Sequence, residues 1–235
     1  RSREALARLA EMGAIYPCRC TRSEIMEASL SAPHQGEHEL RYPGTFRPES
    51  HSQAEANGQA DEQLGWRVRV PLGPYEFQDQ FAGTTRVDTA ATVGDFLVAT
   101  KGGTPSYQLA VVVDDARQKV DRIVRGDDLL TSVPRQQLLY DLLDLTQSPL
   151  YWHLPLVIGT DGRRLAKRHG DTRISTYRSC GTTAERLIGL VAHWSGCGPL
   201  EEMTIAEFAL RFDLARLSAE PVIFSADSES WLRND

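Results

Sequence analysis

The sequence is poor in cysteine, has no long apolar run and carries no excess of positive charge. Its four cysteines include the close pair Cys18-Arg-Cys20, which argues against a disulfide framework and for thiols that are reduced or bound to a metal. No run of about 18 apolar residues is present, so no transmembrane helix is expected. The first residues also lack the pattern of a secretory signal. We therefore predict a cytoplasmic protein that does not enter the membrane.

Charge and composition limit the classes of function. A net charge of −6 argues against non-specific binding to nucleic acid, although a local basic patch can still contact phosphates. The 235 residues, of which 41% are hydrophobic and 25% charged, suffice for a substantial core. They predict one large or two small globular domains, with a long loop or insertion at residues 34–61.

Local patterns predict both helices and strands. Helical spacing or capping residues predict helices at residues 3–13, 21–30, 129–145, 184–191 and 205–212. Alternating or continuous apolar residues predict strands at residues 14–16, 66–70, 77–81, 109–113 and 120–124. The strand at 77–81 is expected to pair with the one at 66–70. Strands that alternate with helices indicate an α/β fold with a largely parallel sheet.

Positive charge is concentrated in one segment, where Asp161-Gly162 predicts a tight turn after the strand end Val157-Ile158. The basic residues that follow the turn are Arg163, Arg164, Lys167, Arg168 and Arg173. A solvated surface loop and a loop that stabilises phosphate both account for this charge.

The order of the residues favours the phosphate loop. Arg164-Leu165-Ala166-Lys167-Arg168 resembles the Lys-Met-Ser-Lys-Ser signature of class I aminoacyl-tRNA synthetases, most closely their glutamyl branch. The resemblance implies that Arg164, Leu165, Lys167 and Arg168 bind ATP, which enters with Mg²⁺. It also implies a catalytic role for Lys167, which would stabilise the charge on the departing pyrophosphate. Arg164 keeps the charge of the family's first lysine, whereas Ala166 lacks the hydroxyl of its serine.

A second stretch resembles the amino acid pocket of the same family. Residues 105–115, Pro-Ser-Tyr-Gln-Leu-Ala-Val-Val-Val-Asp-Asp, and residues 123–130, Ile-Val-Arg-Gly-Asp-Asp-Leu-Leu, carry the likeness. It implies that Tyr107 and Arg125 contact glutamate, and an arginine at the end of a buried strand suits a carboxylate. From the residues alone, packing of Tyr107 on the core and pairing of Arg125 with a neighbouring aspartate remain alternatives.

A third stretch resembles the zinc-binding insertion of these synthetases. Cys18 and Cys20 form its Cys-x-Cys pair, and Tyr42 begins a Tyr-x-Gly-Thr-x-Arg sequence in which Phe46 replaces a further cysteine of the family. The resemblance implies Cys18, Cys20 and Tyr42 as zinc ligands. Because structural zinc usually takes four Cys or His ligands, the lost thiolate favours reduced cysteines with Phe46 as an apolar plug. A zinc site completed by a histidine is the alternative, and the candidates are His34, His38 and His51.

The three likenesses follow the family's order along nearly the whole chain, and the region after the basic loop separates the branches of the family. About 60 residues follow residue 173, too few for the long anticodon-binding region of a glutamyl-tRNA synthetase. This resembles the glutamyl-queuosine tRNA(Asp) synthetases. It implies a ligase that activates glutamate with ATP and transfers it to the queuosine base of tRNA(Asp). A monomer is expected, although the sequence does not determine the oligomeric state. The alternatives are a truncated glutamyl-tRNA synthetase that charges tRNA(Glu), and a non-catalytic tRNA-binding paralogue.

The resemblance also implies a Rossmann-like catalytic domain with a particular organisation. Residues 1–104 would form its second part with the inserted zinc-type subdomain. Residues 105–175 would form its second half with the basic loop, and residues 176–235 a short helical region without an anticodon-binding domain. The family's first strands and its His-Ile-Gly-His-type motif have no counterpart in this sequence. We therefore expect this chain to be part of a longer protein and to be inactive in adenylation alone.

Overall fold

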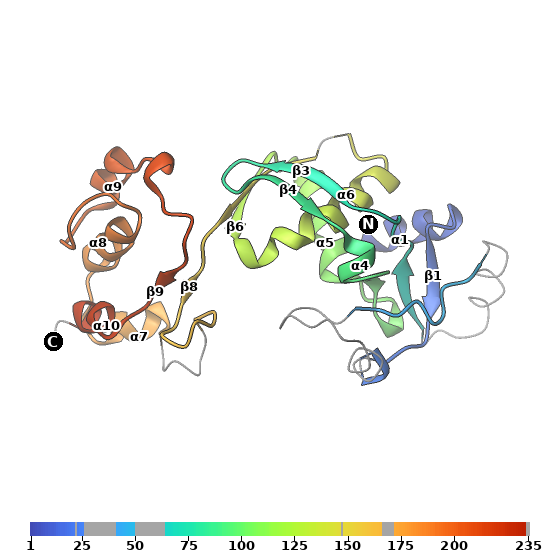
Figure 1. Ribbon diagram of the computed structural model, residues 1–235, viewed down its shortest axis with the longest axis horizontal. Helices are drawn as coiled ribbons and strands as arrows, with labels where there is room; N and C mark the ends of the chain where they lie inside the picture. Colours follow the sequence, from blue (N-terminus) through green and yellow to red (C-terminus); the bar gives the residue numbers. More distant parts are fainter. Residues whose placement is uncertain (22, 26–40, 50–63, 147, 166–171, 234–235) are drawn as a thin grey trace. The chain divides into compact units, whose positions relative to one another are not determined.

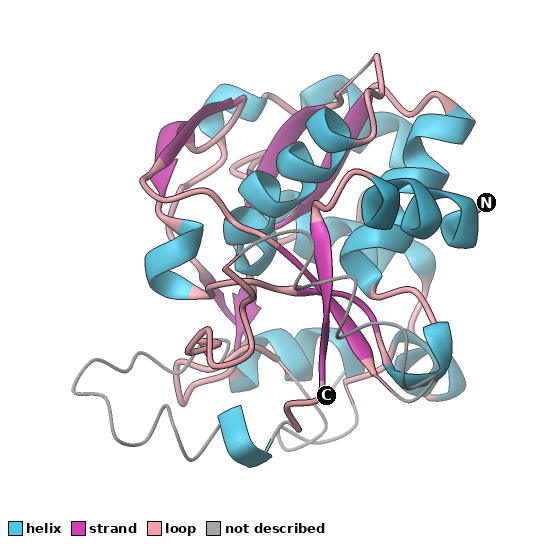
Figure 2. Cartoon of the chain, turned by 90° about the vertical axis from the view of Figure 1, so that its right-hand side faces the viewer, coloured by secondary structure: helices cyan, strands magenta, loops and turns pink. Residues whose placement is uncertain are grey.

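The computed structural model describes residues 1–21, 23–25, 41–49, 64–146, 148–165 and 172–233 (Figure 1). Contacts divide the chain into two compact units. The first comprises Arg1–Arg125 and Leu129–His153, and the second comprises Gly126–Asp128 and Leu154–Asp235. Both units contain helices and strands, which can be followed by colour in Figure 2. The family-based division after residues 104 and 175 stays a prediction.

The elements up to residue 154 include both strands and helices. In chain order they are α1 (Ser2–Glu11), β1 (Ile15–Cys18), β2 (Gly65–Val68), β3 (Tyr75–Asp79), β4 (Gly83–Val87), α4 (Thr89–Thr92), β5 (Leu97–Ala99), the 3-10 helix η1 (Lys101–Gly103), α5 (Tyr107–Gln118), β6 (Arg122–Gly126), the 3-10 helix η2 (Asp127–Ser132), α6 (Val133–Leu142) and β7 (Leu150–Leu154).

A three-stranded antiparallel sheet supports the first unit. β2 is its middle strand, between β1 and β5. Helices α1, α5 and α6 contribute to the hydrophobic core on this sheet. Side chains almost wholly enclosed in that core include Leu9, Ile15, Val68, Val98, Leu109 and Leu139. Burial of each large aliphatic side chain stabilises the fold by about 1.5–3 kcal/mol, so this core fixes the start of α5 against β5.

The strand predicted at residues 109–113 is wrong, because these residues form the middle of α5. Ser106 stands at the N-cap position with extended backbone, from which the helix starts. Leu109 and Val112, three residues apart, are both buried in the core. A short apolar run suits a buried helix and a buried strand equally, and here the helical spacing of the buried side chains decides.

The strand predicted at residues 77–81 exists, but its predicted partner is wrong. β3 pairs with β4 in an antiparallel hairpin in which Asp79 lies opposite Gly83. Gly83 has a φ of +78°, a left-handed conformation that suits glycine at the turn. Closing this short loop costs less chain entropy than joining distant segments, so β3 pairs locally.

Several local predictions are confirmed. The segments 3–13, 14–16, 66–70 and 120–124 coincide with α1, β1, β2 and β6 to within a few residues. At the helix predicted from residue 21, the backbone N–H of Thr21 donates to Oε2 of Glu24 at 2.6 Å, and residues 26–30 lie outside the described part. The helix predicted at 129–145 begins as η2 and continues as α6, whose first turn holds Pro134.

The second unit is largely helical. Its elements are β8 (Val157–Ile158), α7 (Ile174–Ser179), α8 (Ala184–Trp194), α9 (Ile205–Arg211), the 3-10 helix η4 (Leu214–Arg216), β9 (Val222–Ile223) and α10 (Ala226–Arg233). α8 and α9 confirm the helices predicted at 184–191 and 205–212, and β8 pairs with β9 in parallel. The α/β class is therefore confirmed. None of the helices in the described residues is long and apolar enough to cross a membrane.

Candidate functional site

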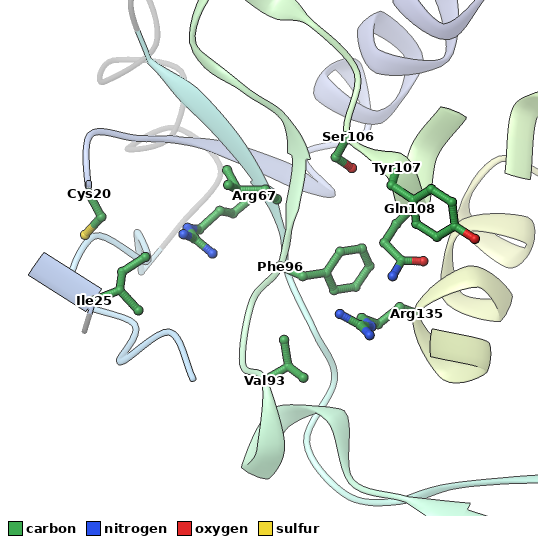
Figure 3. Close-up of a pocket in the computed structure, with 10 residues that line it drawn as sticks. Cys20, Ile25, Arg67, Val93, Phe96, Ser106, Tyr107, Gln108 and Arg135 are labelled. Carbon is green, nitrogen blue, oxygen red and sulfur yellow. The ribbon is translucent and has the colours of Figure 1, made fainter. Parts of the chain in front are cut away.

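A cavity of about 470 Å³ lies in the first unit, beside the start of α5. Its lining includes Arg67, Phe96, Ser106, Tyr107, Gln108 and Arg135, whose side chains Figure 3 draws as sticks. Arg67 comes from β2, Tyr107 and Gln108 begin α5, and Arg135 belongs to α6. Segments far apart in the sequence therefore meet around one hollow.

The two arginines give the cavity its charge. Arg67 is 5% exposed and Arg135 3% exposed. Nη1 of Arg67 donates to the carbonyl oxygen of Asp95 at 2.6 Å, and its guanidinium carbon lies 3.9 Å from the centre of the Tyr42 ring. Nε of Arg67 and the hydroxyl of Ser106 are buried and find no hydrogen-bond partner among the described residues. Buried cations with spare donors favour an anionic ligand such as a carboxylate or a phosphate.

Tyr107 lies at the mouth of this arrangement. It is the first residue of α5, lines the cavity and is 54% exposed. Its exposure argues against the alternative in which it only packs on the core. The resemblance-based expectation that Tyr107 contacts a ligand is therefore compatible with its place in the fold.

Arg125, the other residue expected to contact glutamate, lies in β6 and is not among the residues that line the cavity. Its Nη2 donates to Oε1 of Gln136 at 3.1 Å and to the carbonyl oxygen of Leu129 at 3.3 Å. Gln136 in turn donates from Nε2 to Oε1 of Gln108 at 3.0 Å, and Gln108 does line the cavity. The structure therefore links Arg125 to the cavity through two glutamines.

Arg125 also contacts a buried histidine. Its Nε donates to Nε2 of His153 at 2.9 Å, and Nδ1 of His153 lies 2.6 Å from Oδ2 of Asp79. Burial lowers the pKa of His153, and the nearby Arg125 adds to the effect, so the imidazole is neutral at pH 7. Burial alone would raise the pKa of Asp79, but hydrogen bonds from His153 and from backbone amides lower it. Asp79 is therefore an ionised carboxylate that accepts a hydrogen bond from a neutral histidine.

The residues expected to bind zinc gather in one small cluster. The thiol of Cys18 donates to the hydroxyl of Tyr42 at 3.5 Å, and the backbone N–H of Phe46 donates to the same oxygen at 3.0 Å. Burial and the neighbouring Cys18 raise the pKa of the Cys20 thiol to about 11. In the described part of the chain, no three His, Cys, Asp or Glu side chains are grouped so as to hold a metal.

Zinc therefore gains no support from these residues, and the histidines that were candidates for the missing ligand lie outside the described residues. The prediction that Phe46 plugs the cluster is wrong. Its side chain is 37% exposed, and the guanidinium carbon of Arg19 lies 5.4 Å from the centre of its ring. A contact with an exposed cation holds the ring outside the cluster.

The basic segment begins with a tight hairpin in the second unit. Gly162 has a φ of +74°, and the backbone N–H of Gly159 donates to the carbonyl oxygen of Arg163 at 2.8 Å, which confirms the predicted turn. Nη1 of Arg164 donates to Oδ2 of Asp128 at 2.7 Å, although the Arg164 side chain is 70% exposed. Leu165 is the last described residue before the gap, and its backbone N–H donates to Val157 of β8. Ala166, Lys167 and Arg168 lie outside the described residues.

Sequence reasoning missed the buried polar residues. Alternation in β2 predicts that Arg67 points to solvent, but both faces of this strand are covered. Arg135 lies in the first turn of α6 and carries no local signal of burial. Asp79 and His153 are 74 positions apart, and no pattern connects them in the sequence.

Comparisons with known proteins identify the family of this chain. The family described as tRNA synthetases class I (E and Q), catalytic domain, matches residues 2–230. The glutamyl-Q tRNA(Asp) synthetase of Symbiobacterium thermophilum is 43% identical over 231 residues, which cover 96% of this chain and 70% of the relative. The protein of the same name from Rhodopirellula baltica is 37% identical, with 94% of this chain and 71% of the relative covered.

Two further relatives come from another branch. The glutamate–tRNA ligase of Heliobacterium modesticaldum is 32% identical over 234 residues, which cover 98% of this chain and 46% of the ligase. The solved structure of the glutamate-tRNA synthetase from Elizabethkingia anophelis has a TM-score of 0.74 at 23% identity and covers 98% of this chain and 52% of its own. The last likeness concerns the fold alone. The chain spans about half the length of these two proteins.

Proposed function

The chain belongs to the class I tRNA synthetases of the E and Q type, and from that membership we propose that the protein activates glutamate with ATP and transfers it to the queuosine base of tRNA(Asp). The observation that carries the proposal is the higher identity to the relatives named glutamyl-Q tRNA(Asp) synthetase than to the glutamate–tRNA ligase, over nearly the whole chain in each case. A reaction on tRNA in the cytoplasm is part of the same proposal.

Glutamate binding falls to Tyr107 and Arg125 in this proposal. Nε and Nη2 of Arg125 are engaged within the protein, and none of the hydrogen bonds among the described residues uses its Nη1. A guanidinium held on two nitrogens presents the third to a carboxylate in a fixed direction. The buried Arg67 and Arg135 add positive potential to the neighbouring cavity, which suits a substrate with two carboxylates.

Activation forms a bond between a carboxylate oxygen of glutamate and the α-phosphorus of ATP. The bond from that phosphorus to the bridging oxygen of pyrophosphate breaks, and negative charge collects on the leaving group. We assign Lys167 to the stabilisation of that charge, with Arg164 and Arg168 on the ATP phosphates and Leu165 elsewhere in the ATP site. ATP enters with Mg²⁺. The ion pair of Arg164 with Asp128 is largely exposed and contributes little, so Arg164 can exchange its partner for a phosphate.

Transfer completes the proposed reaction. A ring hydroxyl of the queuosine base attacks the activated glutamyl carbonyl, an ester bond forms, and AMP leaves with the former acid oxygen. The cysteine cluster takes no part in either step, and no step runs through zinc.

The acceptor assay tests this proposal on the protein expressed from its complete reading frame. Labelled glutamate and ATP are supplied with tRNA(Asp) that carries queuosine, with tRNA(Asp) that carries guanine in its place, or with tRNA(Glu). We expect label on the queuosine-containing tRNA(Asp) alone. Label on tRNA(Glu) would replace the proposal with ordinary glutamyl-tRNA synthesis. Label on no acceptor, together with no glutamate-dependent exchange of pyrophosphate into ATP, would indicate a non-catalytic paralogue.

A further inference from the structure

The contact between Arg125 and His153 defines the protonation of the histidine. A guanidinium has only donors, so Nε2 of His153 must offer a lone pair to Nε of Arg125 at 2.9 Å. The single ring proton of the neutral imidazole then resides on Nδ1, which donates to Oδ2 of Asp79 at 2.6 Å. The opposite tautomer would place two N–H groups against each other. The hydrogen bonds therefore run in one direction, from Arg125 through His153 to Asp79.

The end of this chain of hydrogen bonds is rigid. Oδ1 of Asp79 accepts from the backbone N–H groups of Phe81 at 2.9 Å, Ala82 at 2.8 Å and His153 at 3.2 Å. The side chains of Asp79 and His153 are wholly buried. The carboxylate is consequently tied to the β3–β4 turn and to β7 at once. It cannot rotate without leaving the backbone N–H groups of Phe81, Ala82 and His153 without this acceptor.

Further contacts restrict the movement of the Arg125 guanidinium. Nη2 donates to Leu129 and Gln136, and the guanidinium carbon lies 5.3 Å from the centre of the Tyr151 ring. Tyr151 also stacks on His153, with 6.0 Å between the ring centres. The Tyr151 ring therefore contacts both Arg125 and His153 and restricts the movement of each. Well-packed apolar residues of similar volume would stabilise the fold as well as this buried polar network does, so stability alone does not explain the network. The network instead immobilises an arginine on two nitrogens, and within the described part of the chain no hydrogen bond uses its Nη1.

We propose that Asp79 and His153 are positioning residues, which hold the guanidinium of Arg125 in the orientation that presents Nη1 to the glutamate substrate. The inference rests on the proposed function, because it takes glutamate as the ligand of Arg125. Neither residue touches the substrate. Asp79 selects the histidine tautomer, and this tautomer supplies the acceptor for Nε of Arg125. The resulting hydrogen bond sets the direction in which the guanidinium of Arg125 points.

Substitutions that mimic one ring nitrogen at a time separate positioning from packing. In His153→Gln the amide oxygen can take the place of Nε2 and accept from Arg125. In His153→Asn the amide nitrogen can take the place of Nδ1 and donate to Asp79, but the acceptor for Arg125 is lost. Asp79→Asn places an N–H opposite Nδ1 and so forces the other tautomer. The matched control is His193→Asn, an exposed histidine of α8 that belongs to no part of this network.

Kinetics of pyrophosphate exchange on the protein from its complete reading frame give the first readout. We expect His153→Asn and Asp79→Asn to raise KM for glutamate about tenfold or more, with KM for ATP unchanged, since each loses a hydrogen bond to a charged group. His153→Gln should stay within about threefold of the unsubstituted protein, and His193→Asn should match it. Equal KM values for glutamate in the Asn and Gln variants of His153 would overturn the positioning role.

Imidazole ¹⁵N shifts of the unsubstituted protein from its complete reading frame give a second readout that needs no activity. We expect the pattern of a neutral ring protonated at Nδ1 for His153, and the reversed pattern in Asp79→Asn. A proton on Nε2 in the unsubstituted chain would refute the inference even if the variants fail to fold. The absence of glutamate-dependent exchange in the unsubstituted full-length protein would refute the proposed function instead, so the two failures are distinguishable.

Discussion

Replacing Tyr16 by phenylalanine tests how the first unit supports its buried arginine. The hydroxyl of Tyr16 donates to Oδ2 of Asp95 at 2.6 Å, and Oδ1 of Asp95 accepts from the backbone N–H of Val70 at 2.8 Å. The backbone oxygen of Asp95 accepts from Nη1 of Arg67 at 2.6 Å. Tyr16 is 0% exposed and Asp95 3% exposed. Asp95 thus joins β1 and the segment after β2 through its carboxylate, and holds the cavity arginine through its backbone oxygen.

The size of the effect follows from what the carboxylate loses. Tyr16→Phe removes one short, buried hydrogen bond to a charged group and leaves the ring in place. Such bonds contribute about 1.5–3 kcal/mol. The bond from Val70 persists, and so does the contact at 3.4 Å from Nη1 of Arg47, which is partly exposed. We therefore expect a loss of about 2 kcal/mol in the free energy of unfolding. For a domain of roughly 150–250 residues, this lowers Tm by about 4–8 °C.

Thermal and urea unfolding followed by circular dichroism measure this loss, with Tyr75→Phe as the matched control. Tyr75 is 39% exposed, and the described residues offer its hydroxyl no hydrogen bond, so its substitution should change stability by less than about 0.5 kcal/mol. A Tyr16→Phe protein as stable as the control would refute the reasoning, because the bond to Asp95 would then contribute nothing net.

Three further predictions concern other parts of the chain. In the protein from its complete reading frame, Lys167→Ala should lower turnover by about a hundredfold or more and change KM for glutamate little. The control Lys119→Asn should leave turnover unchanged, because the φ of 56° at residue 119 suits asparagine. An unchanged turnover in Lys167→Ala would remove Lys167 from the mechanism. Gly189→Ala should destabilise the second unit by about 1–2 kcal/mol in urea unfolding, since the added Cβ would lie 1.9 Å from the carbonyl oxygen of Glu201 and this outweighs the gain in helix propensity; a more stable variant would contradict that packing. Burial raises the pKa of Tyr151 to about 12, so the stability linked to its protonated form is complete below about pH 10 and is lost as the pH rises towards 12. Urea titrations across this range should show a falling free energy of unfolding. A free energy of unfolding that does not change with pH would disprove the prediction.

Local chemistry was readable from the sequence where the signal and its effect lie within a few residues. The Asp161-Gly162 turn depends on the conformational freedom of one glycine, and the helix start at Thr21 depends on a side chain three residues away. The amphipathic spacing of α8 likewise predicted a helix before any neighbour was known. The motif order along the chain was sufficient to predict the family, which the comparisons confirm.

Other features depended on segments that the sequence does not connect. The apolar run at residues 109–113 was compatible with helix or strand, and only the burial of Leu109 and Val112 against other elements distinguished them. β3 was expected to pair with the strand at residues 66–70, but the short turn at Gly83 pairs it with β4 instead.

The sequence by itself determined where turns and most helices form and which family the chain belongs to, because these follow from short-range geometry and from residue order. The tertiary structure alone decided that Arg67 and Arg135 are buried, and that Asp79 and His153, which are 74 positions apart, meet beside Arg125. The physical reason is that the cost of burying a charge is set by its whole surroundings, and those surroundings exist only after distant segments have packed together.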